Sequence, residues 1–105
     1  RQRQMCIRDR SDVRPETPVE RALVAAVSAR GGLAIKLAPT MRGLPDRLIL
    51  LPNGEMRLVE LKAPGETPRE SQKMVHRHLE AMGHPVTTID TTEGARRWAE
   101  THVTR

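Results

Sequence analysis

Apolar and polar positions follow one another with a changing period along the chain, and each change predicts a new element. Thr17-Pro18-Val19-Glu20 combines an N-cap threonine, a proline at the first helical position and a glutamate three residues after the cap. This sequence predicts a helix that continues to about Arg30, where Gly31-Gly32 supplies residues suited to ending it. Its apolar face is expected to comprise Val19, Leu23, Ala26 and Val27.

The next part of the chain has the two-residue period of β-strands. Residues 33–37 alternate apolar with small or polar side chains, whereas residues 38–45 contain two prolines and a glycine and predict a loop. Residues 46–51 and 56–62 predict two more strands on either side of Pro52-Asn53-Gly54-Glu55. Because Asn-Gly between apolar runs is a strong hairpin signal, we expect these two strands to pair.

The capping sequence recurs at Thr67-Pro68-Arg69-Glu70 and predicts a second helix that ends near Met82. A short strand at 85–89 and a last helix capped by Thr92 complete the chain. The expected order is therefore αβββαβα. A hairpin followed by a strand that is reached through a helix implies an α/β fold, with a mixed sheet flanked by helices. The expected apolar positions of these two helices are Met74, Val75, Leu79, Met82, Ala95, Trp98, Ala99 and Val103.

Length and charge divide the chain into a tail and one domain. The 105 residues suffice for one modest core but not for two. The net charge is +5, of which residues 1–10 carry +3 in a segment with no helical or strand period. We expect residues 1–12 to be a basic tail that is disordered or an artefact of sequencing read-through, and residues 13–105 to form a single domain. The remaining charge favours a polyanionic partner only weakly.

Composition excludes several other classes of protein. With one Trp and no Phe or Tyr, the chain lacks the aromatic platforms on which RNA-recognition sheets stack bases. The single cysteine, Cys6, cannot form an internal disulfide or a cysteine zinc cluster and suits a reducing compartment. No apolar run approaches the roughly 18 residues of a membrane-spanning helix. We therefore expect a cytoplasmic protein with no membrane partner.

Two acidic residues and a lysine are the most informative candidates for chemistry. Glu60 and Lys62 are two residues apart on one predicted strand, so their side chains leave the same face of the sheet. Asp46 begins the partner strand of the same hairpin, and the backbone carbonyl of Leu61 could add a third protein ligand. Carboxylate and carbonyl oxygens suit Mg²⁺ or Mn²⁺, and a neighbouring lysine can orient water or stabilise charge on a phosphate.

Each of these features also has a structural explanation. Pro-Asp is a common turn dipeptide, and Glu-Leu-Lys on an exposed strand is usually a solvated pair of charges. Here, however, Glu60 and Lys62 directly follow the apolar pair Leu58-Val59, where a buried strand would be expected to stay apolar. Breaks of a local rule of this kind tend to mark functional sites.

The combined motif resembles the virus-type replication-repair nuclease (VRR-NUC) branch of the PD-(D/E)XK nucleases. The resemblance rests on Gly43-Leu44-Pro45-Asp46, on Val59-Glu60-Leu61-Lys62-Ala63-Pro64-Gly65 and on Gln72, and it extends from about Pro18 to Trp98. It implies a restriction-endonuclease-like core and metal-dependent cleavage of DNA, with branched DNA or Holliday junctions as typical substrates. It also implies a role in DNA repair in a bacterial or phage-infected cell.

The resemblance assigns roles to individual residues by motif position. Asp46 and Glu60 become metal ligands, and Lys62 becomes the catalytic lysine. Gln72, at the start of the second helix, becomes a residue that supports the metal or the scissile phosphate. The family often has a glutamate on its first helix, which Glu20 matches, although Glu20 serves equally well as the third residue of its capping box.

The hairpin register provides a test of this hypothesis. If Leu51 faced Met56 across the turn, Asp46 and Glu60 would lie on opposite faces of the sheet and could not form one site. We therefore expect a bulge or an odd-length loop near Asn53-Gly54, or a twist at Pro45 that turns Asp46 round.

The sequence thus predicts an Mg²⁺- or Mn²⁺-dependent endonuclease that recognises the shape and charge of the DNA backbone. Candidate phosphate contacts beside the site are Arg42, Arg69 and Lys73, for which a solvated face is the alternative. A domain of this size is expected to dimerise in order to address two strands of a junction. The alternative function is a DNA-binding module that retains the fold without catalysis. His76 and His78, two apart on a helix, diverge too far to share a metal.

Overall fold

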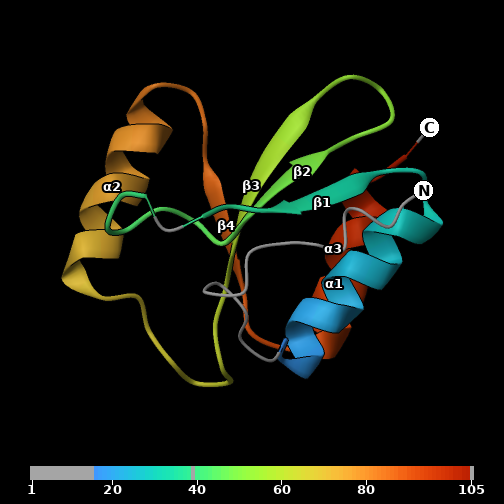
Figure 1. The fold of residues 1–105 in the computed structure, drawn as a ribbon, viewed down its shortest axis with the longest axis horizontal. Coiled ribbons are helices and arrows are strands. Elements are labelled where there is room, and N and C mark those ends of the chain that lie inside the picture. Colours follow the sequence, from blue (N-terminus) through green and yellow to red (C-terminus); the bar gives the residue numbers. More distant parts are fainter. Residues whose placement is uncertain (1–15, 39, 105) are drawn as a thin grey trace.

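A four-stranded sheet forms the centre of the structure (Figure 1). The computed structural model describes residues 16–38 and 40–104, so the expected basic tail at 1–12 lies outside the described residues. Strand order follows chain order, with β1–β2 and β2–β3 antiparallel and β3–β4 parallel. The sheet is therefore mixed, as the sequence predicts. Its strands are β1 (Leu33–Lys36), β2 (Arg47–Leu50), β3 (Met56–Leu61) and β4 (Val86–Ile89).

In the described part of the chain, three helices complete the predicted αβββαβα order. They are α1 (Pro18–Ala29), α2 (Glu70–Ala81) and α3 (Thr92–His102). Helix α1 begins as expected, because Oγ1 of Thr17 accepts a hydrogen bond from the backbone N–H of Glu20 at 3.1 Å. Helix α3 is capped one residue earlier than predicted, by Thr91, whose hydroxyl accepts from the N–H of Gly94 at 2.9 Å.

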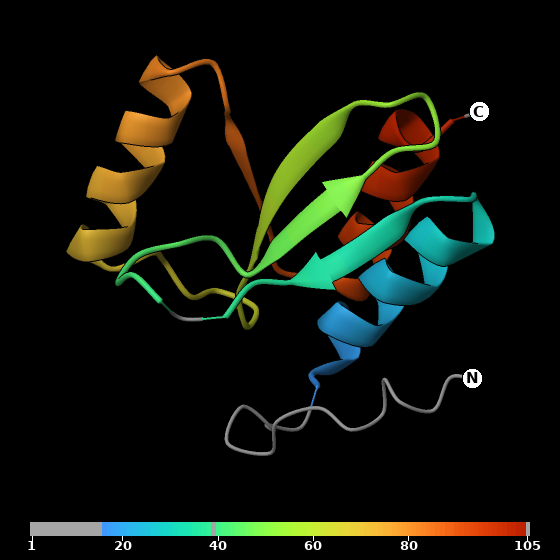
Figure 2. The same cartoon turned by 45° about the horizontal axis from the view of Figure 1, so that its top comes forward.

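The hydrophobic core lies on one face of the sheet, between the strands and the packed pair α1 and α3 (Figures 1 and 2). The residues predicted to line the inner face of α1 are buried or partly buried there, and Trp98 of α3 is 7% exposed. The strands contribute alternate residues to this core, as the two-residue period requires. The fully buried core members are Leu23, Val27, Ile49, Val59, Ala95, Ala99 and Val103.

Helix α2 lies on the opposite face of the sheet and stands apart from the core (Figures 1 and 2). None of its residues is buried; Met74 is 62% exposed, and Met82, the C-cap residue, is 54% exposed. The predicted apolar face of α2 is thus correct only in part, with Val75 and Leu79 half-buried. The helix packs against a loop and a strand edge rather than a core, so burial of its long methionines is incomplete.

The hairpin between β2 and β3 contains the odd-length loop that the site requires. Leu50 pairs with Met56 rather than Leu51 with Met56. The N–H of Leu51 donates to the carbonyl of Glu55 at 2.8 Å, which leaves a loop of Pro52, Asn53 and Gly54. Gly54 adopts a positive φ of 94°, as expected for a three-residue hairpin with a glycine in the left-handed region. The loop therefore sets the register in which acidic residues of both strands share a face.

Helix α2 begins two residues later than the recurrent capping sequence predicts. Its N-cap is Arg69, and Thr67 precedes the helix. Oε1 of Gln72 accepts a hydrogen bond from the backbone N–H of Arg69 at 2.9 Å. The side chain of Gln72, the third helical residue, therefore accepts the capping hydrogen bond at the start of the helix. Thr67 was predicted to be the cap but is not.

Candidate active site

Asp46 enters the site from the residue just before β2. The preceding Pro45 is fully buried, and the carbonyl of Asp46 accepts from the N–H of Leu37 at 3.0 Å, which continues the β1–β2 ladder by one step. Its carboxylate crosses to β3, where Oδ2 accepts from the N–H of Leu61 at 2.8 Å. Because Arg47 pairs with Val59, the same register places Asp46 opposite Glu60. The two carboxylates therefore share one face, as the nuclease hypothesis requires.

Glu60 is a charged residue at a position with the burial of a core residue. It is 1% exposed, and its Oε2 accepts a hydrogen bond from Nε2 of Gln72 at 2.7 Å and lies 3.2 Å from Nζ of Lys62. Its second oxygen, Oε1, is buried and has no hydrogen-bond partner. A buried carboxylate oxygen without a donor is costly, so this atom is suited to a cation.

The amide of Gln72 holds the lysine and the glutamate together. Its Oε1 accepts from Nζ of Lys62 at 2.7 Å and from the N–H of Arg69, while its Nε2 donates to Glu60. These three bonds use opposite ends of the amide and so fix its orientation. Lys62 reaches the group from the end of β3, where its own N–H donates to the carbonyl of Ile89 at 3.0 Å. The structure thus brings together Asp46, Glu60, Lys62 and Gln72.

The electrostatics of the site favour an additional positive charge. Burial raises the pKa of Glu60 above its ordinary value, the nearby Asp46 carboxylate raises it further, and Lys62 opposes both effects. Two carboxylates and one ammonium leave the cluster with a net negative charge. A divalent cation would relieve the repulsion between Asp46 and Glu60.

The donor set fits a hard divalent cation such as Mg²⁺ or Mn²⁺. In an extended strand the N–H and C=O of one residue point to the same side, and the Leu61 N–H points to Asp46, so its carbonyl faces the same edge. Across residues 16–38 and 40–104, no group of three or more His, Cys, Asp and Glu side chains is arranged to hold a metal. Mg²⁺ commonly uses only one or two carboxylates and completes its shell with water and substrate phosphate, so Asp46, Glu60 and the Leu61 carbonyl suffice.

A glycine allows α2 to approach the site closely. Gly43 has a φ of 92°, and a Cβ at this position would lie 2.6 Å from the carbonyl oxygen of Ser71 and 2.7 Å from a methyl group of Val75. Ser71 precedes Gln72, so this contact fixes the first turn of α2 against the loop that leads into Asp46. The glycine of the Gly-Leu-Pro-Asp motif therefore has a packing role that its turn character alone does not reveal.

The structure does not bring Glu20 into this group. Its Oε2 lies 3.2 Å from Nη2 of Arg47 and 4.0 Å from Nζ of Lys36. Arg47 is 5% exposed, points to the α1 side of the sheet, and also bonds Glu16 and the carbonyl of Ala34. The helix cap uses the backbone of Glu20, while its side chain neutralises a buried guanidinium. The sequence suggested a catalytic or a capping role for Glu20 and gave no sign of its ion pair with Arg47. The burial of Arg47 depends on strand register, which the sequence does not show directly.

The three predicted DNA-contacting cations are exposed around the first turn of α2. Arg42 precedes Gly43, Arg69 is the N-cap of α2, and Lys73 lies 3.5 Å from the exposed carboxylate of Glu70. Because Gly43 contacts Ser71, Arg42 belongs to the same end of the molecule as the other two. A surface pair such as Lys73–Glu70 is weak and leaves the lysine accessible to a phosphate.

His76 lies on the same helix as Gln72 and is not among the predicted site residues. It lies one helical turn after Gln72; burial lowers the pKa of its imidazole, the Lys62 ammonium lowers it further, and the Asp46 carboxylate opposes both. Its Nε2 is buried without a hydrogen-bond partner. The spacing of four residues from Gln72 is a signal that could have found it, because such residues share a helix face.

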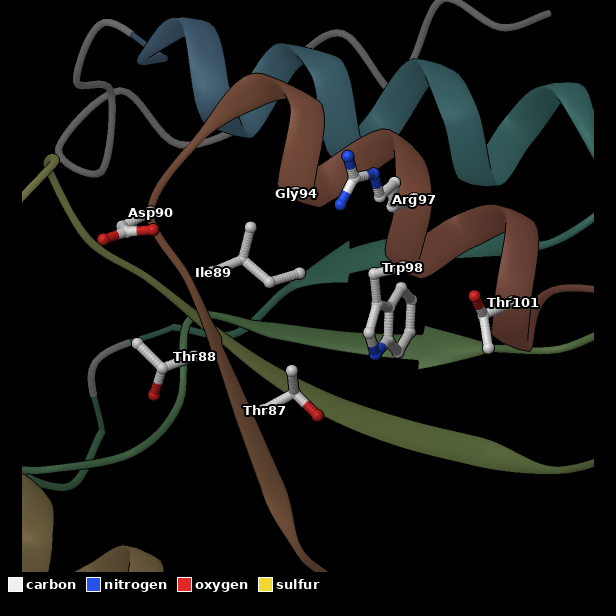
Figure 3. Close-up of a pocket in the computed structure, with 8 residues that line it drawn as sticks. All are labelled: Thr87, Thr88, Ile89, Asp90, Gly94, Arg97, Trp98 and Thr101. Atoms are coloured by element: carbon white, nitrogen blue, oxygen red, sulfur yellow. The ribbon is translucent and has the colours of Figure 1, made fainter.

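A pocket elsewhere in the molecule is separate from this cluster. It lies between β4 and α3, has a volume of about 320 Å³ and is lined by threonines together with Asp90, Arg97 and Trp98 (Figure 3). None of the four clustered residues lines it.

In the described part of the chain, no helix has the length and apolar character needed to cross a membrane.

Comparisons with known proteins agree with this architecture. The fold and the acid-acid-lysine cluster at the end of a hairpin define a nuclease-type α/β domain. A solved VRR_NUC domain superimposes with a TM-score of 0.74 at 27% sequence identity, over 83% of this chain and 96% of that one. A protein named "Putative nuclease p44", from Acyrthosiphon pisum secondary endosymbiont phage 1, is 46% identical over 79 residues, which are 74% of this chain and 85% of that protein. No protein-family model matches the sequence. The chain belongs to the VRR-NUC family of nucleases.

Proposed function

We propose that this protein is a metal-dependent endonuclease that hydrolyses phosphodiester bonds in DNA, with branched DNA or a Holliday junction as its substrate. The observation that supports the proposal most directly is the convergence of Asp46 and Glu60 beside Lys62, with a buried Glu60 oxygen that has no partner. The phage relative named as a nuclease supports the same class of reaction.

Asp46, Glu60 and the Leu61 carbonyl would hold Mg²⁺ or Mn²⁺. Such a cation, when bound, supplies positive charge to the phosphate in the transition state and acidifies water. Lys62 has one N–H donor directed to Gln72 and an ion pair with Glu60, and its remaining donor capacity serves a phosphate oxygen or the attacking water. Gln72 keeps both groups in place and limits the motion that would weaken the stabilisation of charge.

The substrate part of the proposal rests on charge and on the surroundings of the site. The exposed cations Arg42, Arg69 and Lys73 near α2 can contact phosphates, which positions a nucleic acid without reading its bases. A second copy of the chain would place a second site on the other strand of a junction. Sedimentation would detect this dimer, and a monomeric mass with and without DNA would contradict it.

The test is cleavage of a labelled four-way junction and of a linear duplex of the same sequence, with Mn²⁺ as the cation. We expect preferential cleavage of the junction, and a loss of about 10²–10³-fold in Lys62→Ala, because one charge-stabilising donor is removed. Lys36→Ala is the matched control, since Lys36 faces Glu20 on the other side of the sheet, and its rate should stay within about twofold.

Mn²⁺ uptake measured by calorimetry separates the enzyme from the alternative, a DNA-binding module without catalysis. We expect uptake by the wild type and its loss in Asp46→Ala. Junction binding with no cleavage in the presence of bound Mn²⁺ would contradict the proposed reaction. Equal cleavage of the linear duplex would contradict only the preference for branched DNA.

A further inference from the structure

Two buried polar atoms in the candidate active site lack a partner, and only one of them is explained by a metal. Of the described residues, the buried side-chain atoms without hydrogen-bond partners are Nε of Arg47, Oε1 of Glu60 and Nε2 of His76. Arg47 belongs to the ion-pair cluster on the α1 side. Oε1 of Glu60 faces the proposed cation. Nε2 of His76 has no role in the machinery described so far.

The position of His76 relates it directly to the reacting centre. Gln72 and His76 lie one turn apart on α2, and Gln72 bonds both Lys62 and Glu60. The approach of Gly43 to Ser71 and Val75 fixes this part of the helix over the loop that ends at Asp46. His76 therefore follows the part of α2 that packs closely against Gly43, and its pKa responds to the charges of Lys62 and Asp46.

The same surroundings favour a neutral imidazole. Burial lowers the pKa of His76, and the Lys62 ammonium lowers it further, while Asp46 acts in the opposite direction. A neutral imidazole has one nitrogen with a free lone pair, which can accept a hydrogen bond. Lys62 and the Gln72 amide present donors to the site, and the carboxylates of Asp46 and Glu60 are directed to the proposed cation. Nε2 of His76 is therefore, beside Oε1 of Glu60, the other buried acceptor of the described residues that lacks a donor.

We propose that Nε2 of His76 accepts a hydrogen bond from the water that attacks the scissile phosphate, and thereby orients a water lone pair toward phosphorus. This inference rests on the proposed hydrolytic function. It makes His76 a further catalytic residue, because the imidazole contacts a reacting atom. The alternative is a packing role for the ring, which would be independent of the polarity of Nε2.

Nuclear magnetic resonance of histidine labelled with ¹⁵N tests the acceptor directly in the full chain without DNA. We expect the proton of the neutral His76 ring on Nδ1 and none on Nε2. A proton on Nε2 would overturn the assignment, because a protonated nitrogen cannot accept a hydrogen bond. This measurement does not depend on whether the protein cleaves DNA.

Single-turnover cleavage of the junction with Mn²⁺ tests the consequence for the reaction. In His76→Ala we expect the rate to fall about 30- to 100-fold, since a misplaced nucleophile costs up to about 10²-fold. Mn²⁺ uptake and junction binding should stay within twofold. His76→Gln, which restores a polar group near the position of Nε2, should recover about tenfold of the lost rate. The matched control is His78→Ala, because His78 is exposed on the same helix and should cleave at the wild-type rate.

Three outcomes would contradict this proposal in distinguishable ways. Wild-type cleavage by His76→Ala would overturn the role of His76 and leave the nuclease function intact. Equal loss of Mn²⁺ uptake, junction binding and rate, with no rescue by His76→Gln, would show a packing role. Absence of cleavage by the wild-type chain with Mn²⁺ bound would overturn the hydrolytic function and the water-orienting role together.

Discussion

The two faces of the sheet have different tasks. The face toward α1 and α3 is packed with aliphatic side chains and Trp98, and its buried charge, Arg47, is neutralised by glutamates. The face toward α2 bears two carboxylates and a lysine at its end, and the helix above it buries no residue completely. The face toward α1 and α3 therefore supplies stability. The face toward α2 carries charged side chains, of which Glu60 has a buried oxygen without a hydrogen-bond partner.

This difference shows how a small domain can carry a charged site. Burial of Glu60 and the repulsion by Asp46 disfavour the folded state with both acids ionised, so that the core on the opposite face must offset the cost. If so, substitutions on the α1 side should change stability with little effect on chemistry, and substitutions on the α2 side should do the reverse.

The largest effect on stability is expected from Leu23→Ala on the α1 face. Leu23 is fully buried in the core, so its truncation should lower the free energy of unfolding by about 2–5 kcal/mol. Urea denaturation measures the loss, and cleavage per folded molecule should be unchanged. Met74→Ala is the control on α2, where a side chain that is 62% exposed should cost less than about 0.5 kcal/mol. Similar losses in the two variants would refute the division between the faces.

Glu20→Gln tests whether Glu20 contributes to stability on the α1 face or to the reaction on the α2 face. The substitution removes the charge that pairs with buried Arg47 at 3.2 Å, and should cost about 1.5–3 kcal/mol of unfolding free energy. We expect cleavage of the junction to remain within twofold at temperatures where the variant is folded. A large loss of rate with normal stability would instead assign Glu20 to the reaction. Glu100→Gln, at an exposed position of α3, is the control.

Gly43→Ala should disturb the site face through the placement of α2. The added Cβ meets a backbone oxygen at 2.6 Å and requires a positive φ, which together should cost about 1–3 kcal/mol and lower the cleavage rate. Gly54→Ala is a matched control, because Gly54 has a similar φ of 94° but no atom within 4 Å of the added carbon. Equal effects on cleavage in the two variants would mean that close packing against Ser71 does not matter.

The smallest effect concerns the pH dependence of stability. The pKa of Glu60 is raised in the folded state, so the folded protein binds this proton more tightly than the unfolded chain does. The associated stability is present below the ordinary value of 4.5 and is lost as the pH rises through the higher folded pKa. In metal-free buffer, the free energy of unfolding of Glu60→Gln should therefore increase relative to that of the wild type as the pH is raised from acid to neutral. Urea denaturation at both pH values measures this change, which the exposed Glu55→Gln should not show.

Much of the fold could be predicted from local signals. The Thr17 cap, the Asn-Gly hairpin and the order of elements follow from residues close together in sequence, because caps and turns are short-range interactions. The sequence also predicted a bulge, an odd-length loop or a twist at Pro45, and the pairing of Leu50 with Met56 confirms the odd-length loop. The start of α2 was wrong because a side chain of the site, Gln72, caps Arg69.

Periodicity in the sequence by itself determined the αβββαβα order and the residues of the core on α1. Spacing marked Asp46, Glu60 and Lys62 as candidates, and Gln72 followed from the resemblance to the family. Only the tertiary structure decided that Glu20 pairs with Arg47 and that Gly43 contacts Ser71. These contacts connect segments far apart in the chain, and their formation depends on the register and packing of elements rather than on the preferences of any one of them.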